Sequence, residues 1–124
     1  PVDEDAKALP FAESEAGATG LELLLSLSLK WGAQRGLSLA QSLAPICSGP
    51  AKVIGPSLGA QSEGVGRVQV GALADLCVFD PAAAWTVGAD SLRSQGKHTP
   101  FSGYELPGRV RYTLVGGRLA FRAT

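Results

Sequence analysis

Two adjacent glycines, Gly116 and Gly117, separate two short segments that resemble strands, and they constrain the fold more than any other feature. Residues 110–115 and 118–121 are rich in β-branched, aromatic and leucine side chains. A two-residue loop that accepts positive φ at both positions is the usual connection of a tight antiparallel hairpin. The chain is therefore predicted to end in a β-hairpin.

Further strands are expected upstream of this hairpin. Residues 76–79 form an apolar run closed by an Asp-Pro pair, residues 85–87 suit a short strand, and residues 67–70 carry alternating valines. Asp90 stands where it would cap a turn of helix that reaches Ser94. The second half of the chain is therefore predicted to be mainly β.

The first half has a helical pattern instead. Thr19 stands three residues before Glu22, which is the spacing of a capping box. The leucine-rich stretch that follows predicts a helix over about 20–34, although residues 25–29 also alternate like a strand. Helix is favoured because leucine is a good helix former without β-branching, and because Gly36 follows as a stop signal.

Shorter elements are expected between the long helix and the strands. Ser38 and Gln41 repeat the capping pattern, so a second helix is predicted over about 39–44, where a proline ends or bends it. One more helical turn is predicted over 49–54. Residues 55–66 are rich in glycine, serine and proline and are predicted to form a loop.

The charge of the chain argues against polyanionic partners. The formal net charge is zero, so strong attraction to nucleic acid or to an anionic membrane is not expected. No apolar stretch approaches the roughly 20 residues of a membrane span. Acidic residues gather in the first fifteen positions and basic residues from Arg93 onward. Each tract is expected either to face solvent or to meet a partner in a larger assembly.

Few side chains suit metal or nucleophilic chemistry. The only histidine, His98, has no acid or nucleophile beside it in the sequence and is expected to be a surface or structural residue. Cys47 and Cys77 lack zinc-ligand spacing and are expected to be buried free thiols of a reducing, cytoplasmic compartment. Trp31 and Trp85 are expected to anchor the core or an interface. No catalytic residue and no metal site is therefore assigned within the chain.

Several motifs resemble a known enzyme superfamily. Residues 66–80, GRVQVGALADLCVFD, are similar to a stretch that is common in the amidohydrolase superfamily. The acidic start PVDEDAK, GATGLE at 17–22, GKHTPF at 96–101 and GYELPGRV at 103–110 together resemble the C-terminal part of bacterial dihydroorotases. The resemblance covers nearly the whole chain.

The resemblance implies an α/β parent in which a (β/α)8 barrel stands beside a small β-sandwich domain. Residues 1–55 would be the end of the metal-dependent barrel, as a loop plus helices. Residues 56–124 would be part of the small β domain, ending in the hairpin. Pro1 would match a proline just after the last metal ligand, and the chain has no methionine. We therefore expect it to be a fragment of a larger polypeptide.

The resemblance also implies the function of the intact parent. Dihydroorotases interconvert dihydroorotate and N-carbamoyl-L-aspartate, by hydrolysis or closure of a ring amide, in de novo pyrimidine biosynthesis. Zinc ions bound by the parent generate the attacking hydroxide. None of their ligands matches this chain, so the chain alone is expected to bind no zinc and to be inactive. Ala16 and Gly17 match a loop whose backbone contacts the pyrimidine ring, and they are the expected substrate-binding residues.

One position departs from the family pattern and leaves alternatives open. Val2 stands where a histidine usually helps to hold the substrate carboxylate, and valine donates no hydrogen bond from its side chain. The parent is therefore either an active dihydroorotase or a non-catalytic dihydroorotase-like subunit that supports aspartate transcarbamoylase. A free-standing β-rich binding module is a third alternative, against which the missing initiator methionine argues.

The expected partners follow from the leucine-rich helix. Its apolar face would have packed on barrel strands that this chain does not contain, and exposed apolar patches usually mark an interface. We therefore expect pairing with the remainder of the parent chain, and either a homo-oligomer or a complex with aspartate transcarbamoylase. Neither nucleic acid nor a membrane is an expected partner.

Overall fold

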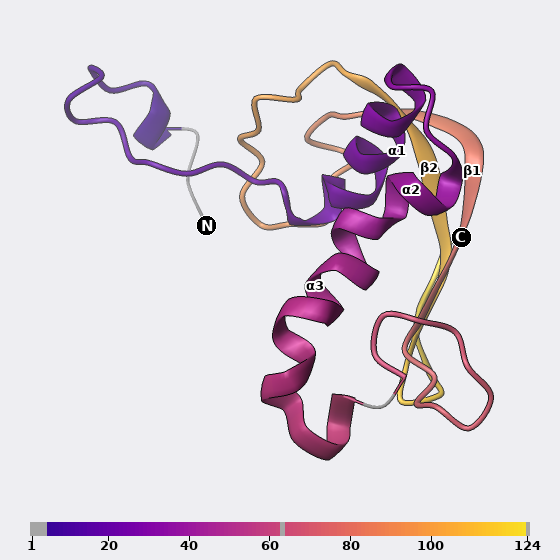
Figure 1. Ribbon diagram of the computed structural model, residues 1–124. Coiled ribbons are helices and arrows are strands. Elements are labelled where there is room, and N and C mark those ends of the chain that lie inside the picture. Colours follow the sequence, from indigo (N-terminus) through magenta and orange to yellow (C-terminus); the bar gives the residue numbers. More distant parts are fainter. Residues whose placement is uncertain (1–4, 63, 124) are drawn as a thin grey trace.

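The computed structural model describes residues 5–62 and 64–123, which form a set of helices followed by a three-stranded antiparallel sheet (Figure 1). The sheet order is β1-β2-β3. The strands are β1 (Leu76–Thr86), β2 (Glu105–Val115) and β3 (Arg118–Arg122), and the α-helices are α1 (Leu24–Gln34), α2 (Leu39–Leu43) and α3 (Ser48–Ile54). Short 3-10 segments cover Asp5–Lys7, Leu21–Leu23 and Ala44–Ile46, and two such turns separated by a kink cover Gly55–Ser62.

The C-terminal hairpin is confirmed, because β2 and β3 pair on either side of Gly116 and Gly117. Both glycines have positive φ, 56° and 77°, as a tight hairpin turn requires. β2 begins five positions earlier than the predicted 110 and contains Pro107. A proline is tolerated there because the pairing with β1 is irregular in this region.

The two short strands predicted over 76–79 and 85–87 are parts of one strand, β1. The register passes from Asp80 opposite Arg109 to Ala84 opposite Pro107, so β1 has extra residues at a bulge. The Ala82 N–H donates to Asp80 Oδ1 at 3.0 Å inside this bulge. The Asp-Pro pair therefore shapes an irregularity within the strand and does not end it.

Two other β-half predictions are wrong. Residues 67–70 form turns and irregular backbone, and no strand is found there. Asp90 caps no helix, because residues 89–91 form only a turn, and Ser91 makes the local contacts by accepting from the Gly88 N–H and donating to the Gly88 carbonyl.

The long predicted helix is confirmed as Leu21–Leu23 plus α1, which excludes the alternative strand over 25–29. Its predicted capping box is wrong: Gly20 is the N-cap, with no side-chain hydrogen bond. Thr19 and Glu22 bond instead to residues far away in the sequence. Long-range partners have displaced the local cap.

The second capping box is confirmed. The Gln41 N–H donates to Ser38 Oγ at 3.3 Å, and the Ser38 N–H donates to Gln41 Oε1 at 2.9 Å. After α2, Pro45 lies in a 3-10 turn. The proline therefore ends the α-helix, but the chain continues in a tighter helical turn. Of the loop predicted over 55–66, residues 55–62 are helical turns, interrupted at Gly59, where φ is 56°, whereas residues 64–66 form a turn.

The core joins the two parts of the chain. Leu23, Val87, Leu92 and Leu106 are buried together, and Leu27, Trp85 and Phe101 pack against them. α1 lies close against β2 beside this core, as Figure 1 shows. Segments before and after residue 55 therefore share one core, which sets the geometry of the site below.

Candidate functional site

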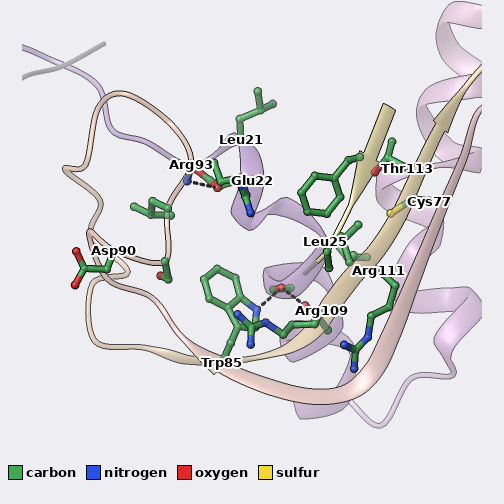
Figure 2. Close-up of a pocket in the computed structure, with 17 residues that line it drawn as sticks. Leu21, Glu22, Leu25, Cys77, Trp85, Asp90, Arg93, Arg109, Arg111 and Thr113 are labelled. Atoms are coloured by element: carbon green, nitrogen blue, oxygen red, sulfur yellow. Dashed lines mark hydrogen bonds between the residues drawn. The ribbon is translucent and has the colours of Figure 1, made fainter. Parts of the chain in front are cut away.

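A cleft of about 820 Å³ opens between the start of α1, the segment 90–93 and one face of the sheet (Figure 2). Its apolar lining includes Leu21, Leu25, Trp85, Val110 and Phe121. Its polar and charged lining includes Glu22, Asp90, Arg93, Arg109, Arg111 and Thr113. A cleft with an apolar floor and a few charged groups is the usual form of a small-molecule or segment-binding site.

Arginines outnumber carboxylates around this cleft. Arg111 pairs with Asp80 at 3.3 Å, and both side chains are about half exposed. Arg93 places its guanidinium 5.2 Å from the centre of the Phe121 ring, which is cation–π distance. The pKa of Asp80 is lowered, chiefly by the Ala82 N–H and then by Arg111, so it stays ionised at neutral pH.

Glu22 binds the backbone of the loop that rims the cleft. Its two carboxylate oxygens each accept a backbone N–H at 2.9 Å, one from Arg93 and one from Ser94. Burial opposes the ionised form of Glu22. The hydrogen bonds from Ser94 and Arg93, with the charge of Lys97, outweigh burial and lower the pKa of the carboxyl. Glu22 is therefore a charged, bidentate clamp on this loop.

The floor of the cleft is fixed by Ser26, which is buried. Its hydroxyl donates to the Gly108 carbonyl at 3.0 Å and accepts from Trp85 Nε1 at 3.1 Å. Gly108 permits this close approach of helix and strand, because a Cβ there would overlap Leu29 Cδ1. Trp85, expected as an anchor, projects from β1 and is partly buried against α1, whereas Trp31 is 41% exposed.

The predicted substrate-binding residues, Ala16 and Gly17, lie outside this cleft. Both are exposed, on the extended segment before α1. Gly17 has φ 108°, a conformation that favours glycine. Within the described residues, the backbone of Ala16 and Gly17 makes no hydrogen bond, and both residues are exposed. Two residues on, Thr19 ties this loop to the body of the molecule.

The cysteines are exposed, so the prediction of buried thiols is wrong. Cys77 belongs to an apolar run of β1, but its side chain is exposed and lines the cleft. Partial burial, and then the nearby Cys47, raise the pKa of the Cys77 thiol. His98 is partly buried, and its carbonyl accepts from the Thr19 N–H at 2.8 Å.

Over 5–62 and 64–123, no group of three or more His, Cys, Asp or Glu side chains is arranged to hold a metal ion. The described residues do not fit a zinc centre. Pro1 and Val2, which carry two of the sequence predictions, lie outside the described residues. No helix in the described part is long and apolar enough to cross a membrane.

The cleft could not be predicted from the sequence. Its arginines belong to the basic tract after Arg93, which was expected to face solvent or a partner. The pairing of β1 with β2 and the packing of α1 on β2 bring Arg109 and Arg111 to the cleft, and the hydrogen bond from the Arg93 N–H to Glu22 holds Arg93 there. The sequence held one signal of the cleft. Arg109 and Arg111 flank Val110, so charged and apolar side chains alternate along this strand.

Known proteins resemble the chain over nearly its whole length. No family model matches it. It is 44% identical over 119 residues to a "Dihydroorotase-like protein" of Pseudomonas aeruginosa and 37% identical over 118 residues to a "Dihydroorotase" of Geobacter metallireducens. These matches cover 96% and 95% of the chain but only 26% of each relative. The chain thus spans about a quarter of the length of these curated relatives.

Solved structures show the same relationship. A D-hydantoinase (dihydropyrimidinase) from Thermus sp. superposes with a TM-score of 0.81 at 28% identity, covering 98% of this chain and 26% of the other. An L-hydantoinase (dihydropyrimidinase) from Arthrobacter aurescens superposes with a TM-score of 0.74 at 33% identity, covering 90% and 24%. The arrangement of these helices and strands is therefore a part of the amidohydrolase fold.

Proposed function

Because this chain belongs to the dihydroorotase-like amidohydrolases, we propose that it is the C-terminal part of a cyclic amidohydrolase that interconverts dihydroorotate and N-carbamoyl-L-aspartate. In the hydrolytic direction water adds across one ring amide, which gives a carboxylate and a ureido nitrogen. The supporting observation is the match to dihydroorotases and dihydroorotase-like proteins over 94–99% of the chain. We place this reaction in cytoplasmic de novo pyrimidine biosynthesis.

The proposed contribution of this chain is a scaffold and one loop that contacts substrate. Residues 1–55 would complete the barrel of the parent, and residues 56–124 would form part of its small β domain. The shared core of Leu23, Val87, Leu92 and Leu106 supports a fixed arrangement of these parts. The exposure of Ala16 and Gly17, and the absence of backbone hydrogen bonds at both within the described residues, support contact with a ring amide, because such N–H and C=O groups can pair with it.

The proposed zinc ions would be held by the remainder of the parent chain. A bound dication lowers the pKa of its water and supplies hydroxide near neutral pH. The residues described here offer no ligand cluster for it. The chain alone would therefore bind no zinc with stoichiometric occupancy and would not hydrolyse dihydroorotate.

A second function is favoured by two relatives and one residue. The Pseudomonas aeruginosa and Pseudomonas putida relatives, 44% and 41% identical, are both named dihydroorotase-like, whereas six relatives named dihydroorotase are 34–37% identical. Val2 replaces the expected carboxylate-binding histidine. The alternative is a non-catalytic subunit that assembles with aspartate transcarbamoylase or with copies of itself.

Assays on the intact parent polypeptide separate the two functions. The active enzyme should contain zinc and open the dihydroorotate ring, and Val2→His should lower its KM if another contact only partly replaces the missing histidine. The non-catalytic subunit should show no turnover and should co-sediment with aspartate transcarbamoylase. A parent that neither opens the dihydroorotate ring nor co-sediments with aspartate transcarbamoylase would contradict both proposals.

A further inference from the structure

Thr19 and Glu22 have the spacing of a helix cap, yet neither caps the helix. The Thr19 hydroxyl donates to the Gly96 carbonyl at 2.8 Å, and the Thr19 N–H donates to the His98 carbonyl at 2.8 Å. Glu22 accepts from the N–H groups of the loop at 2.9 Å through both oxygens. A local cap contributes about 1 kcal/mol to a helix, and the chain forgoes it for four contacts to one distant loop.

That loop, residues 92–99, is itself held in place. Leu92 and Thr99 are buried, and Lys97 Nζ donates to the Leu92 carbonyl at 2.6 Å. Gly96 is buried beside them. The acceptors of Thr19 therefore lie on braced backbone, and a bond to them fixes the position of Thr19 relative to the core.

The other end of the Ala16-Gly17 loop has no such support. The Glu15 N–H donates to the Ala6 carbonyl at 3.2 Å, and the Glu15 carbonyl accepts from Lys7 Nζ. Both contacts stay within the N-terminal segment, which Figure 1 shows extending away from the helices and the sheet. Among the described residues, Thr19 is thus the first residue after this loop that is bonded to the body of the molecule.

We propose that Thr19 and Glu22 are positioning residues, which clamp the start of α1 to the 92–99 loop and thereby hold the backbone of Ala16 and Gly17 where the substrate ring binds. The inference rests on the proposed function, because it takes these two residues as the substrate-contacting loop. Neither Thr19 nor Glu22 touches the substrate. Each acts through backbone that lies two to six residues away.

The effect on kinetics follows from the role. A backbone contact to the ring that is equally strong in the ground state and the transition state contributes uniform binding, so its loss raises KM and leaves kcat nearly unchanged. Removal of the Thr19 hydroxyl leaves one acceptor unpaired, and the loop loses one of its two Thr19 anchors. We expect KM to rise about three- to tenfold.

The experiment uses the intact parent polypeptide. Thr19→Val, which keeps the shape and removes the hydroxyl, is compared with Thr19→Ser, which keeps the hydroxyl. Thr86→Val is the matched control, because Thr86 is exposed and its side chain makes no hydrogen bond in the described structure. Glu22→Gln with Glu13→Gln as its control tests the second clamp in the same way. The readouts are KM and kcat for dihydroorotate, the dissociation constant of dihydroorotate by calorimetry, and hydrogen exchange of the Thr19 amide.

The proposal expects a raised KM and dissociation constant with kcat within about twofold for Thr19→Val, recovery in Thr19→Ser, and faster exchange of the Thr19 amide. Wild-type turnover with no change of KM in Thr19→Val overturns the positioning role, even if exchange is faster. Equal loss of kcat and thermal stability without a change of KM also overturns it. Absence of turnover and of dihydroorotate binding in the wild-type parent is a different result, which sinks the proposed function instead.

Discussion

Replacement of Gly108 by alanine tests the close packing of α1 on β2. Gly108 has φ 89°, where an L-residue is strained by about 1–2 kcal/mol. A Cβ at this position would overlap Leu29 Cδ1 and come within 3.8 Å of Ser26 Oγ. Because the overlapping atom is the end of a side chain that can rotate, the crowding should cost about 1 kcal/mol, the low end for overpacking.

These two costs together reach about 2–3 kcal/mol. Alanine also stiffens the unfolded chain relative to glycine, which offsets about 0.4–1 kcal/mol. We therefore expect Gly108→Ala to lower the free energy of unfolding by about 2 kcal/mol. Urea titration followed by tryptophan fluorescence would measure it, since Trp85 lies beside the contact.

Two comparisons separate strain from crowding. Gly103 has a similar φ of 80° and open space around the Cβ position, so Gly103→Ala should show the strain alone. In a Leu29→Ala background the crowding disappears, and the extra cost of Gly108→Ala should fall toward the Gly103→Ala value. Equal losses for Gly108→Ala and Gly103→Ala, or no change in the Leu29→Ala background, would refute the packing argument.

Three further outcomes are expected. Gly32→Ala should destabilise the chain by about 1–3 kcal/mol in a denaturant titration, although alanine favours helices, because its Cβ would lie 2.5 Å from the Ser42 Cβ and force the helices α1 and α2 apart; a stabilised variant would contradict this contact. The lowered pKa of Glu22 contributes stability that is present at neutral pH, above the ordinary value of 4.5, and is lost as the pH falls through the lowered pKa. The stability difference between wild type and Glu22→Gln should therefore shrink below about pH 4.5, and a difference that grows in acid would reverse the sign of the argument. Because burial raises the pKa of the Cys77 thiol, iodoacetamide should modify it more slowly at pH 7.5 than an unhindered thiol, as mass spectrometry of the Cys77 peptide would show; an equal or faster rate would contradict the raised pKa.

Elements with local causes were predictable from the sequence. The hairpin at Gly116 and Gly117 follows from backbone conformations that glycine accepts, and the capping box of Ser38 and Gln41 is closed by residues three positions apart. The leucine-rich helix formed over nearly the predicted span. In each case the decisive hydrogen bonds join near neighbours, so no distant residue was needed to establish them.

The same local rule failed at Thr19 and Glu22. Their spacing is that of the successful box, but the folded chain brings the Gly96 and His98 carbonyls and the loop N–H groups within reach. The Thr19 hydroxyl and the Glu22 carboxylate therefore form hydrogen bonds with these distant backbone groups and not with the first turn of the helix. A capping pattern in the sequence cannot reveal that competing partner, which lies more than seventy positions away.

The family relationship could be predicted from the sequence, because motifs along nearly the whole chain carry it, and similar proteins are named dihydroorotase or dihydroorotase-like protein. The arginine-lined cleft and the clamp on the 92–99 loop were decided by tertiary structure alone. The pairing of β1 with β2 across a bulge and the close packing of α1 against Gly108 bring these residues together. Such contacts depend on strand register and on the distance between helix and sheet. The irregularities in β1 shift its register against β2 away from simple alternation, and packing between remote segments sets the distance between helix and sheet.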